Sequence, residues 1–208
     1  MTHTISAHAL WSAAQFVSTD PTRHWISGVS VEPRKGGGAL LIATDGQALV
    51  CIEDTSAEVS RKLLIGVNKP AMAALKHKSS SVATYDDAGM LTVNDHNGTA
   101  TYIAPDGAWV ATAFPDWRKI MAGGDKPDDK AALIDPATLM RFDALYGRPC
   151  DRKRGDACAL YLKLNGTSPI LVTTDLPGLF GVMMPMLHKK QQPAYASFAE
   201  ALASVAAS

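Results

Sequence analysis

Adjacent acidic residues are the first groups in the sequence that could support catalysis. They form the pairs Asp86-Asp87, Asp95-His96 and Asp128-Asp129. Each pair lies in a polar, turn-like segment, and adjacent residues on a strand point to opposite faces of a sheet. No pair therefore provides the facing acid and base that general acid-base catalysis requires. We expect no catalytic centre and predict that the protein is not an enzyme.

Cysteine and histidine, the usual ligands of transition metals, show none of the spacings of a metal site. Cys150 and Cys158 flank the segment CDRKRGDAC, but no second pair completes a zinc site. The six histidines, at positions 3, 8, 24, 77, 96 and 188, form no HxH or HExxH pattern. The run Gly36-Gly37-Gly38 lacks the lysine that follows a phosphate-binding loop. The sequence predicts no metal and no other cofactor.

The composition limits the partners that bulk charge could attract. Lys plus Arg and Asp plus Glu both number 20, so the formal net charge is zero. Any contact with DNA must therefore come from local basic patches. The odd number of cysteines, three, and the absence of a secretory signal favour a cytoplasmic location. The sequence contains no run of 18 apolar residues, so no membrane span is predicted.

An internal repeat is the most informative feature of the chain. Three strand-like segments contain a turn, and they read ALLIATDGQALVCIE (39–53), ATYIAPDGAWVATAF (100–114) and ILVTTDLPGLFGVMM (170–184). Their turn aspartates are Asp45, Asp106 and Asp175. Asp-Gly in the first two turns is a strong hairpin signal, because glycine tolerates positive φ. In the third segment Leu-Pro-Gly follows the aspartate, so this turn must differ.

A helix-like segment precedes each turn at a similar distance. Ser6 can cap a helix over 7–18, Pro70 stands where a second begins, and Asp135 followed by Pro136 marks the start of a third. Strand-like runs complete the pattern at 25–33, 62–67 and 131–134, with Gly28 as an expected bulge or kink. Further hairpins are predicted through Asn97-Gly98 and Asn165-Gly166.

The repeated unit is thus a strand, a helix and about three strands. Three such units predict an α+β fold with antiparallel sheets and the helices on one face. Their open sheet edges favour pairing between neighbouring units. We expect two units in a domain over 1–124, a half-domain over 128–188 and a helical or flexible tail over 189–208. The polar, glycine-rich stretch 123–129 is the expected boundary.

Three motifs in this order resemble the sliding clamp, the β subunit of bacterial DNA polymerase III. The segment WISGVSVEP…ALLIATDGQAL resembles the middle clamp domain with its A-T-D-G-x-x-L turn. FPDWRKI (114–120) is similar to the clamp motif F-P-D-Y-R-x-V, and FGVMMPML (180–187) to the terminal V-V-M-P-M-R-L. The resemblance covers roughly residues 5–188. The family's first domain and the first half of its last domain have no counterpart, and Gln47-Ala48 replace the usual His-Arg.

The resemblance implies a hydrophobic pocket that binds short peptides of polymerases and repair proteins. Carried over from the three motifs, its walls are Thr44, Leu49, Pro115, Arg118, Ile120, Val182, Met184, Pro185 and Met186. Such a pocket can accept apolar side chains, and methionines make its surface adaptable. An alternative is that Met183, Met184 and Met186 simply belong to the core. Strand alternation places Met184 and Met186 on one face and Met183 on the other.

In family clamps the helices line a central hole and present basic residues to DNA. The DNA-contact candidates that this implies are Lys76, Lys78, Arg148, Arg152, Lys153 and Arg154. The alternative is a solvated helix end, where cations favour the helix dipole. The first helix segment has no Lys or Arg, which does not favour a ring around DNA.

The sequence thus leads to two hypotheses of function. The first is a clamp-like replication accessory protein that binds partner peptides and holds double-stranded DNA, without sequence specificity, in a homo-oligomeric ring. The family ring has twelve half-domain units, so four chains of three units would close it. The second is a peptide-binding adaptor, or a decoy of a host clamp, that does not encircle DNA.

Overall fold

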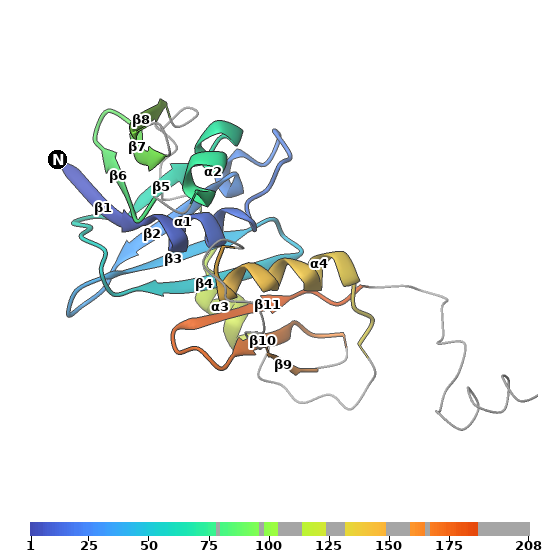
Figure 1. The fold of residues 1–208 in the computed structure, drawn as a ribbon. Helices are drawn as coiled ribbons and strands as arrows, with labels where there is room; N and C mark the ends of the chain where they lie inside the picture. Colours follow the sequence, from blue (N-terminus) through green and yellow to red (C-terminus); the bar gives the residue numbers. More distant parts are fainter. Residues whose placement is uncertain are drawn as a thin grey trace, which may run out of the picture.

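The computed structural model describes residues 1–77, 80–95, 98–103, 114–123, 132–148, 159–164 and 167–186. These residues form three successive groups of strands, each accompanied by a helix (Figure 1). The first group comprises β1 (Thr2–Ser6), α1 (Ala7–Ala14), η1 (His24–Ile26), β2 (Gly28–Pro33), β3 (Ala39–Thr44) and β4 (Ala48–Asp54). The second comprises β5 (Leu63–Gly66), α2 (Lys69–Lys76), β6 (Val82–Asp86), β7 (Met90–Asp95) and β8 (Gly98–Ile103). The third comprises α4 (Pro136–Arg141), η3 (Phe142–Tyr146), β9 (Leu160–Lys163), β10 (Ile170–Thr174) and β11 (Leu179–Met183), and α3 (Trp117–Gly123) precedes it.

The helices α1, α2 and α4 each begin at a polar cap. The side chains of Ser6, Asn68 and Asp135 accept hydrogen bonds from backbone amides of the first turns of α1, α2 and α4. These contacts satisfy amides that have no partner within the helix. The predicted caps Ser6 and Asp135 are therefore confirmed, and Pro70 lies in the first turn of α2 as expected. The first helix is shorter than predicted and ends at Ala14 rather than at residue 18.

The first two units exchange strands. Strand β1 of the first unit pairs with β6 of the second, and β5 of the second pairs with β2 of the first. This exchange gives a four-stranded sheet of order β1-β6-β7-β8 and places β5 at the edge of the other sheet. The helices α1 and α2 contact each other above the joined sheets. The two units thus bury their open edges against each other, as their sequence pattern predicts.

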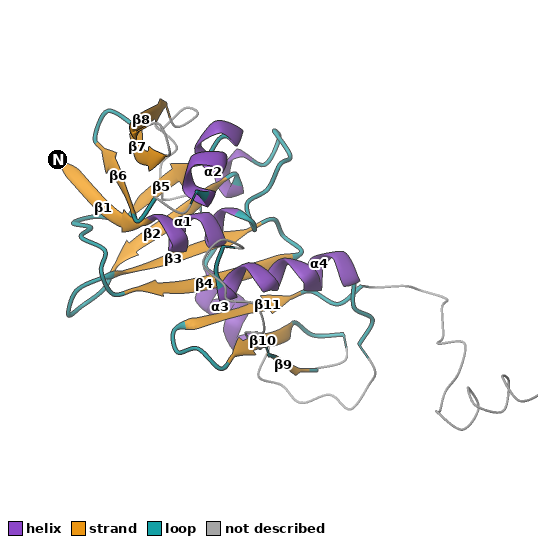
Figure 2. Cartoon of the chain, viewed as in Figure 1, coloured by secondary structure: helices purple, strands orange, loops and turns teal. Residues whose placement is uncertain are grey.

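The third unit continues the larger sheet. Strand β11 pairs antiparallel with β4, which gives a seven-stranded sheet of order β5-β2-β3-β4-β11-β10-β9. The helices α1, α2 and α4 lie on one face of the strands, and α3 lies on the other (Figure 2). Two groups of buried side chains correspond to these faces: a large one beneath α1 and α2, and a smaller one that includes Phe114 and Trp117. The predicted α+β fold, with antiparallel sheets and the helices of the three units on one face, is confirmed.

Two local predictions need correction. Gly28 forms no bulge, because it begins β2 and pairs in regular register with Gly66. A Cβ at Gly28 would lie 2.9 Å from the Ile65 carbonyl oxygen, so glycine is required there by close strand approach. The predicted strand at 131–134 is absent over the described residues 132–134, although the Met186 amide donates to the Leu133 carbonyl (2.8 Å).

Other predictions lie wholly or partly outside the described residues. The strands of the predicted hairpins pair as β7 with β8 and as β9 with β10. Their turn residues at 96–97 and 165–166, the turn at Asp106, residues 124–129 of the predicted boundary and the predicted tail over 189–208 are not described. Gly123, the first residue of that boundary, is the last residue of α3. None of the described helices is long and apolar enough to cross a lipid bilayer.

Candidate functional site

The candidate site is built on one row of residues across three neighbouring strands. Leu49 of β4 pairs with Thr44 of β3 on one side and with Val182 of β11 on the other. Paired residues of antiparallel strands present their side chains to the same face of a sheet. Thr44, Leu49 and Val182 therefore lie side by side, although 138 residues separate the first from the last. Pairing between the first and third units thus creates this surface.

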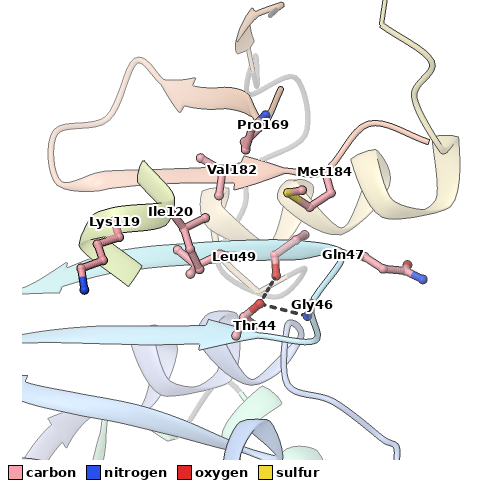
Figure 3. Close-up of a pocket in the computed structure, with 10 residues that line it drawn as sticks. Thr44, Gly46, Gln47, Leu49, Lys119, Ile120, Pro169, Val182 and Met184 are labelled. Carbon is pink, nitrogen blue, oxygen red and sulfur yellow. Dashed lines mark hydrogen bonds between the residues drawn. The ribbon is translucent and has the colours of Figure 1, made fainter. Parts of the chain in front are cut away.

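A pocket with a volume of about 410 Å³ lies over this row (Figure 3). Ile120 and Lys119 of α3 form one side of it, and Met184, just after β11, lies at the end near Gln47. Its full lining is Thr44, Gly46, Gln47, Ala48, Leu49, Lys119, Ile120, Pro169, Val182 and Met184. Most of these side chains are apolar, and the polar ones come from the turn and from α3. Such a pocket is suited to apolar groups of a ligand, with polar contacts at the rim.

The turn between β3 and β4 forms one wall of the pocket and is held by local hydrogen bonds. The Thr44 hydroxyl donates to the Ala48 carbonyl (2.7 Å) and accepts from the Gly46 amide (3.0 Å). The Asp45 carboxylate accepts from the amides of Gln47 (2.9 Å) and Ala48 (3.0 Å). Gly46 has a φ of +90°, a conformation that side-chain-bearing residues rarely adopt. The wall is thus preformed by the A-T-D-G sequence itself.

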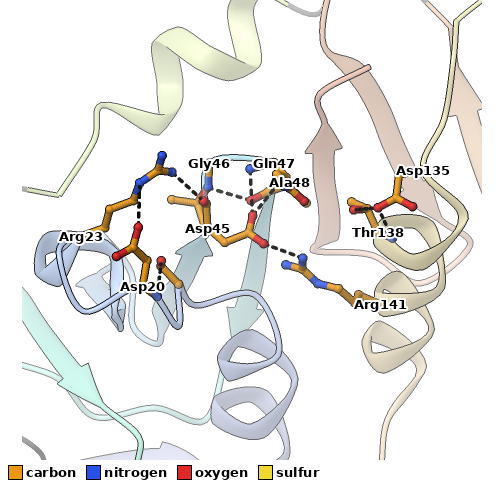
Figure 4. Close-up of polar contacts among 11 residues, drawn as sticks. Asp20, Arg23, Asp45, Gly46, Gln47, Ala48, Asp135, Thr138 and Arg141 are labelled. Carbon is orange, nitrogen blue, oxygen red and sulfur yellow. Dashed lines mark hydrogen bonds and ion pairs between the residues drawn. The ribbon is translucent and has the colours of Figure 1, made fainter. Parts of the chain in front are cut away.

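An ion pair joins this turn to the third unit (Figure 4). Arg141 of α4 donates from Nη1 to the Asp45 carboxylate at 2.6 Å, and both side chains are mostly buried. Burial opposes ionisation of Asp45, but hydrogen bonds from the Ala48 amide, Arg141 and the Gln47 amide outweigh it. The pKa of Asp45 consequently lies below its ordinary value of 3.8. The Arg141 guanidinium also lies 4.8 Å from the centre of the Phe16 ring.

The opposite wall depends on α3 being held against the sheet. Trp117 is buried in the smaller apolar cluster together with Phe114, and Ile120 packs against that cluster. Arg118 lies over the Trp117 ring at 4.2 Å and donates to the Glu32 carboxylate at 3.0 Å. Arg118 therefore points to β2 and anchors the helix. Lys119, its neighbour, lines the pocket.

The structure brings together five of the nine predicted pocket residues. Thr44, Leu49, Ile120, Val182 and Met184 line the cavity, whereas Pro115, Arg118, Pro185 and Met186 are not among its lining residues. The sequence reasoning missed Gly46, Gln47, Ala48, Lys119 and Pro169. Four of these five stand within two of the three motifs, so inspection of every motif position would have found them. Pro169, just before β10, carried no such signal.

The methionines at the end of β11 separate as strand alternation predicts. Met183 is buried in the core beneath the helices, whereas Met184 and Met186 are exposed. Met184 lines the pocket, and its amide donates to the Gln47 carbonyl at 2.7 Å. The alternative that all three methionines are core residues is therefore wrong for Met184 and Met186.

One of the DNA-contact candidates is buried and internally bonded. Arg148 is 5% exposed and donates to the carbonyl groups of Leu75 (2.9 Å), His77 (3.0 Å) and Ser80 (2.6 Å). Its guanidinium joins the third unit to the end of α2, so its prediction as a phosphate contact is wrong. Lys76 is exposed at the end of α2. The remaining candidates, Lys78, Arg152, Lys153 and Arg154, lie outside the described residues.

No metal-binding group is found among the side chains that the structure describes. Within that part of the chain, no three histidine, cysteine, aspartate or glutamate residues lie close enough to hold an ion. Cys51 is buried in the smaller apolar cluster, and burial raises the pKa of its thiol to about 12. The described part of the chain thus offers apolar and hydrogen-bonding surface rather than reactive groups at this site.

Comparison with known proteins shows structural similarity without sequence similarity to a family model or a curated protein. No protein-family model matches the sequence, and no curated protein matches it. Solved structures do match, among them the DnaN sliding clamp from Bartonella birtlesii bound to griselimycin, with 13% identity and a TM-score of 0.56 over 90% of this chain and 66% of that one. The DNA polymerase III β subunit from Thermotoga maritima matches with 10% identity and a TM-score of 0.57, over 94% of this chain and 66% of that one.

A third match is DNA polymerase III subunit β from Borrelia burgdorferi in complex with a natural product. It shows 9% identity and a TM-score of 0.57, over 90% of this chain and 64% of that one. The chain therefore has the fold of bacterial sliding clamps, and it spans slightly less than two thirds of the length of these proteins.

Proposed function

We propose that this chain, which has the fold of bacterial sliding clamps, binds short linear peptides of replication or repair proteins in the pocket over Leu49 and Val182. The observation that carries the proposal is the meeting of three distant segments. Residues 44–49, 119–120 and 182–184 converge on one cavity of about 410 Å³. The chain spans slightly less than two thirds of the length of the sliding clamps that it matches, and it contains all three segments that build this cavity.

The lining favours a peptide with two neighbouring apolar anchors, such as a leucine and an aromatic residue. Burial of each such side chain contributes about 1.5–3 kcal/mol. The ordering of a flexible peptide offsets part of this gain, so binding of roughly micromolar strength is expected. Gln47 and Lys119 at the rim offer an amide and an ammonium group for the peptide's polar or acidic residues. The exposed side chain of Met184 can adapt to several related sequences.

A second candidate function is an adaptor that uses the pocket without encircling DNA. The placement of Arg148 favours it, because this guanidinium is occupied by three backbone carbonyl groups instead of facing solvent. The absence of Lys and Arg from α1 and the zero net charge favour it as well. A clamp that holds DNA in an oligomeric ring remains the first hypothesis, with Lys76 as its exposed basic residue in the described chain.

The peptide proposal is tested by titrating the full chain into a fluorescein-labelled peptide that contains adjacent leucine and phenylalanine residues. Anisotropy should report saturable binding at micromolar concentrations. Met184→Asp should weaken it at least about tenfold, because a carboxylate cannot be buried against an apolar ligand without a partner. Met186→Asp is the matched control, since the two methionines are 44% and 42% exposed and only Met184 lines the pocket.

Two results would count against the proposal. Wild-type protein that does not bind such peptides would remove its support. An equal loss of binding in both variants would show that charge near the end of β11, and not this pocket, controls the interaction. Titration of double-stranded DNA at low salt then separates the two candidate functions, because only the ring hypothesis expects salt-sensitive DNA binding.

A further inference from the structure

Among the described strands, none partners the third unit in the way that the first two units partner each other. In the first two units, β1 pairs with β6 and β5 pairs with β2, so each unit receives a strand from the other. In the described chain, β9 pairs with β10 and has no strand on its other side. As far as the described residues go, the third unit thus corresponds to half of a two-unit domain, and no described strand lies on its exchange edge.

The segment before α4 is placed as β1 is placed in the first unit. Thr4 lies two residues before the cap of α1, and it forms a bridge with Glu58 just after β4 (3.1 and 2.9 Å). Leu133 lies two residues before the cap of α4, and its carbonyl accepts from Met186 just after β11 (2.8 Å). The segment 132–134 thus occupies the position of an exchange strand, and none of the described strands pairs with it.

Burial shows the same incompleteness. On the exchanged strands of the first two units, Ile5 is 1% exposed and Ala83 is 0% exposed. At the corresponding places of the third unit, Ile134, Leu160 and Leu162 pack against the core but are only half-buried. Apolar side chains that pack against the core but remain partly exposed to solvent within one chain indicate a surface that another element covers.

Exposed apolar side chains gather around this edge. Leu133, Tyr161 and Leu164, which lie in the 132–134 segment, in β9 and directly after β9, are 42%, 58% and 47% exposed. A sheet edge with large apolar side chains is a template for pairing with another chain. An edge of this kind on a half-domain can be completed by a second half-domain of the same design.

We propose that the third unit is an interface for a second copy of this chain, in which the two third units exchange their 132–134 segments. Each segment pairs with β9 of the other copy, as β1 pairs with β6 within the chain. Because the same surface serves both copies, the contact is twofold symmetric and closes on itself. Ile134, Leu160 and Leu162 become core residues of a domain built from two chains. The peptide pocket over Leu49 is not part of this contact, so the inference stands apart from the proposed function.

The test is the mass of the full chain measured by sedimentation over a range of concentrations. The wild type should sediment as two chains of 22.1 kDa each, or as a multiple of two. Leu133→Lys combined with Tyr161→Lys should halve that mass, with a dimer dissociation constant raised about tenfold or more, because the exchange places like charges on neighbouring strands. Both residues are exposed in the single chain, so its folding should persist, as circular dichroism will show.

Leu176→Lys is the matched control, since Leu176 is also 42% exposed but lies in the turn between β10 and β11. It should leave the mass unchanged. Hydrogen exchange provides a second readout: amides of 132–134 and 160–163 should gain protection when concentration drives association. A single-chain mass for the wild type at every concentration overturns the proposal. An oligomer that persists in the double variant, or that forms without this gain in protection, overturns it equally.

Discussion

The Arg141 guanidinium donates a hydrogen bond of 2.6 Å to the Asp45 carboxylate and so joins the helix of the third unit to the turn that forms a wall of the pocket. The two side chains are 26% and 20% exposed, and this contact spans 96 residues of sequence. Like the pairing between β4 and β11, this ion pair connects the first unit to the third. The pocket therefore depends on the docking of the first and third units.

Removal of this ion pair should weaken both the fold and the pocket. Arg141→Met keeps an apolar stem over Phe16 but leaves Asp45 without its charged partner. We expect the free energy of unfolding to fall by about 1.5–3 kcal/mol, as measured by urea denaturation. Peptide affinity should fall as well, because the turn of Gly46 and Gln47 loses its anchor. Arg61→Met breaks a surface pair with Asp87 and should change stability by about 0–1 kcal/mol; an equal effect of the two variants would contradict this account.

The same carboxylate should contribute to the pH dependence of stability. Its pKa in the folded protein lies below 3.8, so its contribution is present above 3.8 and is lost as pH falls through the folded pKa. Wild type and Asp45→Asn should therefore differ in stability by a constant amount above about pH 5 and converge in stronger acid. Other carboxylates titrate in both proteins and cancel in the difference. If the stability difference between wild type and Asp45→Asn grew on acidification, the pKa of Asp45 would be raised in the folded protein and not lowered.

Close packing between β11 and β4 gives a separate prediction. A Cβ at Gly181 would overlap the Leu49 carbonyl oxygen and lie 2.7 Å from Cε1 of Phe142. Backbone cannot yield as a flexible side chain does, so Gly181→Ala should separate the strands beneath the pocket. Thermal unfolding should show a loss of about 1–3 kcal/mol, together with weaker peptide binding. Unchanged stability would mean that the two strands do not pair at this position.

Substitution of Arg148 tests whether its guanidinium stabilises the fold or contacts DNA. Its guanidinium donates to the carbonyl groups of Leu75, His77 and Ser80, so Arg148→Ala should lower the free energy of unfolding by about 1.5–3 kcal/mol or more. Lys76→Ala, at an exposed position in the last turn of α2, should stay within about 0.5 kcal/mol of the wild type. If Arg148→Ala kept full stability and lost only DNA affinity, its role as a phosphate contact would be restored.

The repeat made much of the fold predictable. The caps Ser6 and Asp135, the Asp45-Gly46 hairpin and the strand runs are local signals, and they recur at similar spacing in each unit. Local signals do not specify which unit pairs with which edge. The exchange of β1 and β5, and the pairing of β4 with β11, were therefore not predicted and are known only from the structure.

The site was predictable where a backbone register fixes it. Thr44 lies beside Leu49 because the motif turn sets the register of β3 and β4, whereas Val182 joins this row only through the pairing of β4 with β11. Arg118 and Lys119 are neighbours on a helix, and sequence alone could not decide which of them faces the cavity. In the structure Arg118 turns away from the cavity because it pairs with Glu32 on β2, and Lys119 lines the cavity instead. Arg148 was misjudged because a basic segment after a helix suggests solvent, whereas three carbonyl groups at the end of α2 bind its guanidinium.

The most direct test of the central claim is methyl NMR spectroscopy of the full chain during titration with the leucine-phenylalanine peptide. We predict that methyl resonances of Leu49, Ile120, Val182 and Met184 shift together in proportion to the bound fraction. Val29 and Val31, which face the core beneath the helices, should remain unchanged. Shifts confined to the helix-covered face, or an unchanged spectrum at saturating peptide, would contradict the assignment of this pocket as the peptide site.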